Sequence, residues 1–144
     1  MVREITSKDL QKWIELRCLL WPMHTKLEIE TECASLIKNR NYKTWFYYNE
    51  DGDVLGFIEA TIKDSAVGCK TDKIGYLEAW FVLQEYRQQK IGTKLVVSVE
   101  NWAKSKGCKE LASDTTSEYP ISVLAHNSLG YEVCKNITHF KKEL

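Results

Sequence analysis

The sequence has 144 residues, the usual size of one domain built around a single hydrophobic core. Its 20 basic and 20 acidic side chains cancel to a net charge of zero, so the chain as a whole exerts no attraction on nucleic acid or on an anionic membrane. Hydrophobic residues make up 44% of the chain, as in ordinary globular proteins, and no apolar run reaches the roughly 20 residues that cross a bilayer. We therefore expect one globular domain over residues 1–144, without a nucleic-acid or membrane partner.

The cysteines and histidines indicate neither disulfides nor a metal site. The 5 cysteines are odd in number and widely spaced, and no C-x-x-C pair occurs among them. Because the N-terminus carries no apolar run of the signal-peptide kind, we expect reduced thiols and a cytoplasmic location. The three histidines, His24, His126 and His139, are scattered without the spacing of metal ligands, so no metal is expected.

The first half of the chain predicts a strand, two helices and a hairpin. Helical spacing places Leu10, Trp13, Ile14, Arg17 and Trp21 on one face of a helix that starts near Ser7 and ends at Pro22. The other elements expected here are a strand at 2–6, a helix from about Leu27 to Asn39, and antiparallel strands at Thr44–Tyr48 and Val54–Ile62 joined by an Asp51-Gly52 turn.

The second half predicts a crossover between parallel strands. A polar loop at Lys63–Lys73 leads into a long apolar strand, Ile74–Leu83, and Gly107 is a natural end for the helix Ile91–Lys106. That helix would connect Ile74–Leu83 to a parallel strand at Glu110–Ser113. The remaining elements expected are a helix at Ile121–Leu129, with Ile121, Leu124, Ala125 and Leu129 inward, and a last strand at Thr138–Lys142. The fold class is mixed α/β.

The junction between the long strand and the next helix is a candidate anion site. Backbone N–H groups at a helix start lack intrahelical acceptors and lie at the positive end of the helix dipole, so a diphosphate fits there. Every strand-to-helix turn has such amides, and a plain connector is the alternative.

Three further places hold candidate ligand-binding side chains. Glu78 is the one charged residue within Ile74–Leu83, so it faces a cleft or pairs with a buried cation for structure alone. Asp114 follows the short strand, at the end where open α/β sheets bind ligands, although a turn or helix-cap aspartate is the common alternative. Trp21 and His24 flank a proline stop, where a core tryptophan and a surface histidine would be ordinary.

The segment Arg87–Gly92 resembles the Arg/Gln-x-x-Gly-x-Gly/Ala pyrophosphate loop of the GNAT superfamily, with Lys90 in place of the first glycine. The resemblance implies a mostly antiparallel central sheet with a splayed parallel pair, flanked by helices. It implies acetyl-CoA as cofactor, with the pantetheine arm along the backbone of Trp80, Phe81 and Val82. The implied phosphate-binding residues are Arg87, Gln88, Gln89, Lys90, Ile91, Gly92 and Thr93. Lys90 would either add charge to the phosphate site or remain a solvated lysine.

Across nearly the whole chain the sequence is similar to the aminoglycoside 6'-N-acetyltransferases. The specific motifs are Trp21-Pro22-x-His24 and Ala112-Ser113-Asp114. The resemblance implies an aminoglycoside pocket lined by Trp21, His24, Glu78 and Asp114, with Asp114 and Glu78 as candidate catalytic bases. It places Tyr119, where the family has an asparagine, near the cofactor, and His126 where many GNAT enzymes have a tyrosine thought to protonate the sulfur of coenzyme A.

Other features of the resemblance concern assembly and specificity. It implies a homodimer, and the exposed aromatic character of the C-terminal region (Tyr131, His139, Phe140) is compatible with a strand-mediated interface. A family tyrosine is missing near Ser65–Val67, and Lys135 aligns with an acidic residue, so the preferred antibiotic stays open. The alternatives are a GNAT enzyme acting on a polyamine or a protein N-terminus, and a non-catalytic acyl-CoA-binding module.

Overall fold

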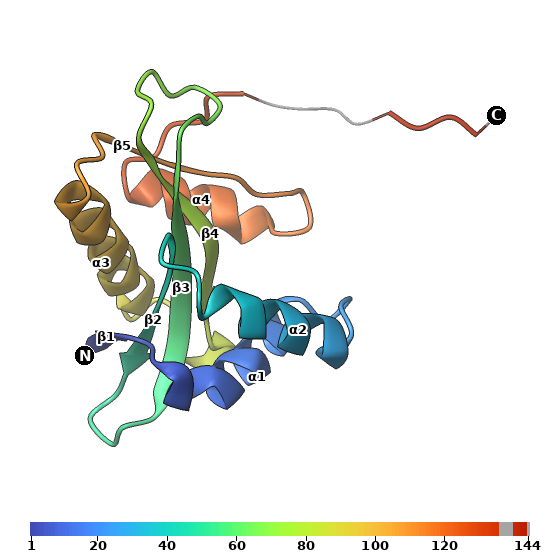
Figure 1. Cartoon of the computed structure of the whole chain (residues 1–144), viewed down its shortest axis with the longest axis vertical. Helices are drawn as coiled ribbons and strands as arrows, with labels where there is room; N and C mark the ends of the chain where they lie inside the picture. The colour runs from blue at the N-terminus through green and yellow to red at the C-terminus, as the bar shows by residue number, and fades with distance from the viewer. Residues whose placement is uncertain (136–139, 144) are drawn as a thin grey trace.

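The computed structural model describes residues 1–135 and 140–143, which form one five-stranded sheet covered by helices (Figure 1). The strands lie in chain order: β1 (Val2–Glu4), β2 (Tyr42–Tyr48), β3 (Val54–Lys63), β4 (Ile74–Val82) and β5 (Glu110–Ser113). The helices are α1 (Leu10–Leu20), α2 (Lys26–Leu36), α3 (Ile91–Ser105) and α4 (Pro120–Ser128), with short 3-10 turns η1 (Ser7–Asp9) and η2 (Gln84–Tyr86). Strands β1 to β4 are antiparallel and β5 runs parallel to β4, so the expected mixed sheet is confirmed.

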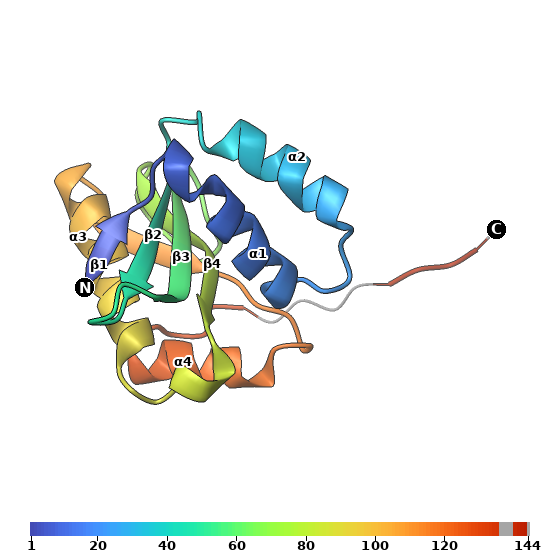
Figure 2. The same ribbon diagram turned by 90° about the horizontal axis from the view of Figure 1, so that it is seen from below.

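Helices cover both faces of the sheet. Figure 2 shows α1 and α2 on one face and α3 and α4 on the other. Each face has its own apolar cluster: Trp13 and Phe57 lie in the cluster beneath α1 and α2, and Ile58 and Leu95 lie in the one beneath α3. In the described residues no helix is both long enough and apolar enough to cross a membrane.

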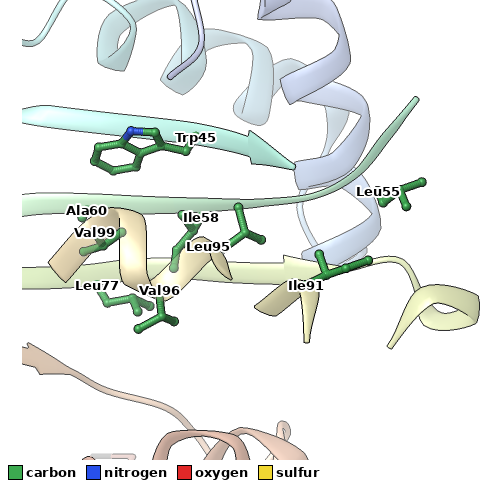
Figure 3. Close-up of a cluster of buried hydrophobic side chains, with 9 residues drawn as sticks. All are labelled: Trp45, Leu55, Ile58, Ala60, Leu77, Ile91, Leu95, Val96 and Val99. Carbon is green, nitrogen blue, oxygen red and sulfur yellow. The ribbon is translucent and has the colours of Figure 1, made fainter. Parts of the chain in front are cut away.

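The inward face of α3 is the one that its sequence period predicts. Ile91, Leu95, Val96 and Val99 recur at helical spacing and pack on Ala60, Leu77 and their neighbours in the sheet (Figure 3). The helix ends at Gly107, whose φ of 84° is left-handed, and the N–H of Cys108 bonds the carbonyl of Ala103 at 3.0 Å. Helix α3 therefore begins and ends within one residue of the helix that the sequence predicted.

A buried ion pair ties α1 to the middle of the sheet. The Glu59 carboxylate is fully buried and accepts hydrogen bonds from the Trp13 indole N–H and the Tyr42 hydroxyl. Arg17 Nε lies 3.4 Å from Glu59 Oε1. Burial raises the pKa of Glu59, and the Arg17 charge with the two neutral donors opposes that rise. Removing one partner would leave the other charge uncompensated, so this pair fixes the position of α1.

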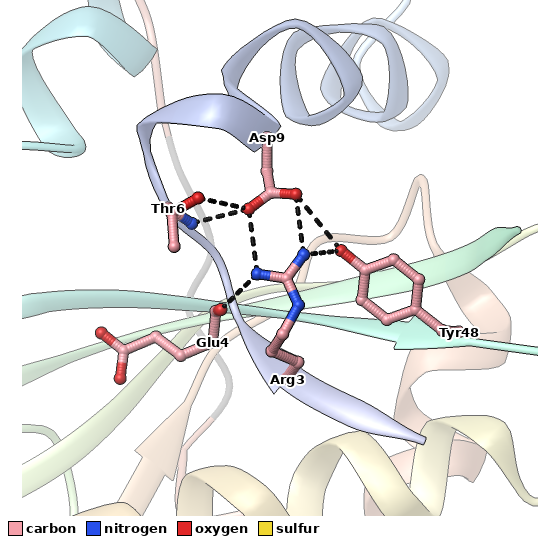
Figure 4. Close-up of polar contacts among 5 residues, drawn as sticks. All are labelled: Arg3, Glu4, Thr6, Asp9 and Tyr48. Carbon is pink, nitrogen blue, oxygen red and sulfur yellow. Dashed lines mark hydrogen bonds and ion pairs between the residues drawn. The ribbon is translucent and has the colours of Figure 1, made fainter. Parts of the chain in front are cut away.

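The N-terminal segment is held by a second polar cluster, drawn in Figure 4. Arg3 donates from both terminal nitrogens to the Asp9 carboxylate, at 3.1 and 2.8 Å, and also to the Tyr48 hydroxyl. Asp9 Oδ2 accepts the Thr6 N–H at 2.8 Å and the Thr6 hydroxyl at 2.9 Å. These bonds satisfy donors at the start of the first helical turn, and they lower the pKa of Asp9, with the Arg3 hydrogen bond as the largest cause.

Three expectations for the C-terminal part are wrong. In α4, Ile121 and Leu124 are 65% and 70% exposed, and the inward residues are Ser122, Ala125, His126 and Leu129. The predicted last strand at Thr138–Lys142 is not found at 140–142, and Thr138 and His139 lie outside the described residues. Tyr131 is half-buried against His126, with ring centroids 5.2 Å apart, so its contribution to an exposed aromatic surface is also corrected.

Candidate active site

The sheet opens between β4 and β5. The parallel pairing ends at Leu77 and Ser113, and beyond that point the residues from Ala79 to Val82 pair with β3 alone. The β3–β4 register also shifts here, because Glu59 faces Ala79 and Ala60 faces Leu77. Glu78 is thus the extra residue of a β-bulge, a feature that bends a strand and re-aims its side chains. The splayed parallel pair that the sequence resemblance implied is confirmed.

Glu78 lies on the α1–α2 side of the sheet, at the bulge. Its Oε1 accepts the Thr61 hydroxyl at 2.6 Å and lies 2.9 Å from the Lys63 ammonium. The Glu78 side chain is 27% exposed and that of Lys63 is 38% exposed, so the pair sits at a rim and is not buried. Glu78 therefore has a cationic partner, but not the buried one that the structural interpretation predicted, and it remains accessible to a ligand.

Tyr76 joins this group and was missed by the sequence analysis. The Lys63 ammonium lies 3.4 Å from the centroid of the Tyr76 ring. Burial, together with the nearby Asp114 carboxylate, raises the pKa of the Tyr76 hydroxyl to about 12. Tyr76 therefore stays protonated at neutral pH and is no proton acceptor there. Tyr76 and Glu78 are two positions apart in β4, so their side chains lie on one face of the strand.

Trp21 and His24 lie at the turn between α1 and α2. The Arg17 guanidinium sits 4.7 Å from the centre of the Trp21 ring, so the indole rests on the cation that Glu59 holds. His24 is exposed and its Nδ1 lies 4.0 Å from Glu28 Oε2. Within the described residues His24 forms neither a hydrogen bond nor an ion pair with Glu78 or Asp114, so the structure groups Asp114 with Tyr76 and Glu78 and leaves His24 apart.

The loop after β4 leads into the first turn of α3, whose leading N–H groups come before the first intrahelical hydrogen bond. The first intrahelical bond of α3 runs from the Lys94 N–H to the Lys90 carbonyl at 3.1 Å, so the N–H groups of 91–93 precede it. Gln88 and Lys90 have left-handed φ values of 62° and 60°. This conformation explains why glycine suits the place of Lys90, since a side chain there costs roughly 1–2 kcal/mol.

Two further residues fix this loop. The Arg87 side chain turns back, and its Nε donates to the Val82 carbonyl at 3.0 Å. A Cβ on Gly92 would lie 2.7 Å from Cζ2 of Trp80, so glycine is required for α3 to approach β4 this closely. The end of β4 and the start of α3 therefore form one rigid corner. The remaining predicted phosphate-binding residues, Gln88, Gln89, Ile91 and Thr93, belong to the same corner.

His126 on α4 faces the opening between the strands. Its Nδ1 lies 2.7 Å from the Ser122 carbonyl, and its Nε2 lies 3.0 Å from the Ser113 hydroxyl. Since a carbonyl only accepts, the neutral ring carries its proton on Nδ1 and Nε2 accepts from Ser113. The ring also packs edge-on against Trp80, with centroids 5.5 Å apart. The polar group that His126 presents at the end of the β4–β5 pairing is therefore the Ser113 hydroxyl.

Tyr119 lies beside the C-terminal end of α1. Its hydroxyl donates to the Leu20 carbonyl at 3.4 Å, next to Trp21 at the end of α1. The cofactor contact implied for Tyr119 stays a prediction.

The residues fit an acyl-CoA. Free amides at the start of α3 suit a diphosphate, and the side of β4 left open beyond Leu77 offers backbone groups to a pantetheine arm, as in strand addition to a sheet edge. Among the described residues no cluster of His, Cys, Asp or Glu has the arrangement of a metal site.

Comparison with known proteins supports the same assignment. The sequence model of the Acetyltransferase (GNAT) family matches residues 10–131. The chain is 35% identical over 144 residues to the aminoglycoside N(6')-acetyltransferase type 1 of Acinetobacter baumannii, covering 99% of this chain and 98% of the relative. It is 33% identical over 147 residues to the protein of that name from Klebsiella aerogenes, covering 100% and 97%.

Solved structures agree with the sequence relatives. The aminoglycoside antibiotic 6'-N-acetyltransferase AAC(6')-Ih from Acinetobacter baumannii superimposes with a TM-score of 0.88 at 35% identity, over 100% of this chain and 98% of that one. AAC(6')-Iy in complex with the bisubstrate analog CoA-S-monomethyl-acetylneamine gives a TM-score of 0.90 at 30% identity, over 100% and 98%. With a family match over most of its length and relatives aligned nearly end to end, the chain belongs to the GNAT family of acetyltransferases.

Proposed function

We propose that this protein transfers the acetyl group of acetyl-CoA to the 6'-amine of aminoglycoside antibiotics and so confers resistance to them. The observation that carries the proposal is the opening between β4 and β5, which has an anion-binding helix start at one end and Glu78 with Asp114 at the other. The relatives named above act on this amine, and one was solved with an analog that joins CoA to acetylneamine.

On the cofactor side, bound acetyl-CoA supplies an activated acetyl thioester. The N–H groups of 91–93 bind its diphosphate, and Arg87 keeps the loop closed on Val82. Backbone N–H groups of Trp80–Val82 on the open side of β4 orient the pantetheine arm. An N–H aimed at the thioester oxygen would stabilise the negative charge that develops there without reorganising during the reaction.

On the acceptor side, the carboxylates bind ammonium groups and accept a proton. An aminoglycoside amine is largely protonated at neutral pH, so it must lose a proton before it attacks. Asp114 is the proposed acceptor, directly or through water, and Glu78 binds a neighbouring ammonium. General-base assistance of this kind contributes typically about 10² to 10⁴-fold. The Ser113 hydroxyl at the end of the β4–β5 pairing donates its one proton to His126 Nε2, so the departing thiolate leaves as the anion or takes its proton from solvent.

The test compares acceptors that differ in one group. Acetylation of neamine should proceed, and an otherwise identical compound with a 6'-hydroxyl should not be acetylated. Spermidine and a peptide N-terminus test the runner-up acceptors in the same assay. Binding of acetyl-CoA without turnover of any amine would favour the non-catalytic alternative.

We propose further that the protein is a cytoplasmic homodimer. Exposed apolar side chains on α4, Ile121 and Leu124, and Phe140 beyond it, support an interface on this side of the molecule. Sedimentation at micromolar concentration should give twice the 16.7 kDa of the chain, and a 16.7 kDa species would contradict the dimer.

A further inference from the structure

Lys63 stands inside the proposed acceptor site as a built-in cation. It is the last residue of β3, and its ammonium reaches across to β4, 2.9 Å from Glu78 Oε1 and 3.4 Å from the centre of the Tyr76 ring. A carboxylate beside an aromatic face is a combination that binds ammonium ions, through a charge-assisted hydrogen bond and a cation–π contact. The position of Lys63 Nζ therefore marks an ammonium subsite made by Glu78 and Tyr76.

The surroundings allow the lysine to leave that subsite. Its side chain is 38% exposed and unbranched, and it lines an open hollow of about 590 Å³ together with Ile62, Asp64, Ser65 and Asp72. The two aspartates offer the displaced ammonium other anionic neighbours. A partly exposed ion pair of this type is worth at most about a fivefold change in an equilibrium constant. An incoming polycation can meet that cost.

We propose that Lys63 occupies an ammonium subsite of the free enzyme and that an ammonium group of the acceptor displaces it, so that Lys63 sets the affinity for polycationic acceptors. This inference rests on the proposed function, because it takes Glu78 as part of the acceptor site. Two ammonium groups at one carboxylate and one ring would repel each other, so lysine and acceptor occupy the subsite in turn. In the absence of acceptor, Lys63 keeps the half-buried Glu78 charge paired.

The experiment measures neamine binding by calorimetry in the presence of CoA. Lys63→Met keeps most of the length of the side chain and removes its charge, and we expect its Kd for neamine to fall about threefold to fivefold below that of the wild type. Lys63→Arg retains a cation and should stay within about twofold of the wild type. The matched control is Lys12→Met, which removes an equal charge from an exposed pair, Lys12–Glu15 at 3.3 Å on α1, and should also leave Kd within about twofold.

A double variant with Glu78→Gln distinguishes competition for Glu78 from a change in folding. If Lys63 competes for Glu78, adding Lys63→Met to Glu78→Gln should produce no further tightening, and circular dichroism should show that all variants are folded. An unchanged or higher Kd for Lys63→Met would overturn the inference, as would equal tightening in Lys12→Met. Turnover of neamine by the wild type is measured in parallel, since its loss contradicts the proposed function while a tighter Kd in Lys63→Met still supports the subsite. Absence of neamine binding to every variant would overturn both.

Discussion

At the scale of single residues, Lys90 combines a useful charge with an unfavourable backbone. Its φ of 60° is left-handed, a conformation that costs any residue with a side chain roughly 1–2 kcal/mol. Glycine avoids this cost, but part of the gain is lost because glycine raises the conformational entropy of the unfolded chain. Lys90→Gly should therefore raise the free energy of unfolding by about 0.5–1 kcal/mol in urea titrations. Lys90→Ala removes the same ammonium but keeps the Cβ, so it should give no such gain.

The same two variants decide whether the Lys90 ammonium assists the diphosphate. Both remove it, so both should weaken acetyl-CoA binding by a similar factor, up to about fivefold, in calorimetry. Unchanged affinity in both variants would show a merely solvated lysine. A change of affinity in Lys90→Gly alone would mean that the backbone conformation, and not the charge, matters.

Asp114 and Glu78 should differ in their kinetic effects. Asp114→Asn keeps the shape of the side chain and removes both its charge and its basic oxygen, so kcat for neamine should fall about 10²-fold or more while acetyl-CoA affinity barely changes. Glu78→Gln should chiefly raise the KM for neamine, because its role is to bind an ammonium group. Wild-type kcat and KM in both variants would remove the basis for assigning either residue to the acceptor site.

At the scale of elements, the hydrophobic periodicity of the sequence predicted the inward face of an element where apolar burial determines it. It failed where hydrogen bonds between polar side chains determine that face. It placed α1, α3 and the five strands within a few residues of their observed ends, because apolar burial sets those faces. In α4 it placed Ala125 and Leu129 correctly on the inward side but wrongly turned Ile121 and Leu124 inward. The inward residues Ser122 and His126 are held by hydrogen bonds to each other and to Ser113, and no hydrophobic pattern records such bonds.

The candidate site was predictable to a similar extent. The strand-to-helix corner and the two carboxylates follow from strand ends and from one charge in an apolar run. The bulge at Glu78 does not, since alternation gives no sign of where an extra residue enters a strand. Lys63 and Tyr76 were missed for a related reason. Their contact joins the last residue of β3 to the middle of β4, and only the register of the two strands brings them together.

The start of α1 offers a test of pH-dependent stability. The Arg3 and Thr6 bonds lower the pKa of Asp9 below its unfolded value, so the folded state prefers the carboxylate. That stabilisation is fully present above the unfolded pKa of about 4 and is lost as pH falls through the folded one. Asp9→Asn should thus cost about 1–2 kcal/mol at pH 7, a figure reduced for the partial exposure of Arg3.

The measurement is urea unfolding of the wild type and Asp9→Asn at pH 7 and at pH 3. The difference between the two proteins should shrink at the lower pH, where the unfolded carboxyl is protonated. Asp53→Asn is a suitable control, because Asp53 also accepts a side-chain hydrogen bond, from Asn49 at 3.1 Å, but forms no ion pair among residues 1–135 and 140–143. A difference for Asp9→Asn that is the same at both pH values would exclude the charged network as its source.

At the scale of the whole molecule, the residues proposed for the two substrates lie in different layers. The acceptor residues lie on the side of α1 and α2, where Trp21 rests on the Arg17–Glu59 pair. The cofactor residues belong to the end of β4 and the start of α3, which packs on the opposite face. Although the chain is neutral overall, the proposed acceptor end carries negative charge from the carboxylates of Glu78, Asp114, Asp64 and Asp72. Substrate charge is thus matched locally, without a net charge on the protein.

Because acetyl-CoA would bridge β4 and α3, its binding should stabilise the entire domain. A ligand at 100 times its Kd adds about 2.7 kcal/mol to the free energy of unfolding, which for a domain of this size raises Tm by roughly 5–10 °C. Differential scanning calorimetry should show this rise for the wild type and equally for Asp114→Asn, whose change lies on the acceptor side. Gly92→Ala should lose most of the ligand-induced rise, since its new Cβ would lie 2.7 Å from Trp80 and force the corner apart. The quantity compared is the rise within each protein, so a lower starting Tm of Gly92→Ala does not affect the result. A full rise in Gly92→Ala would show that the cofactor does not depend on the β4–α3 corner, and no rise in the wild type would exclude this binding mode altogether.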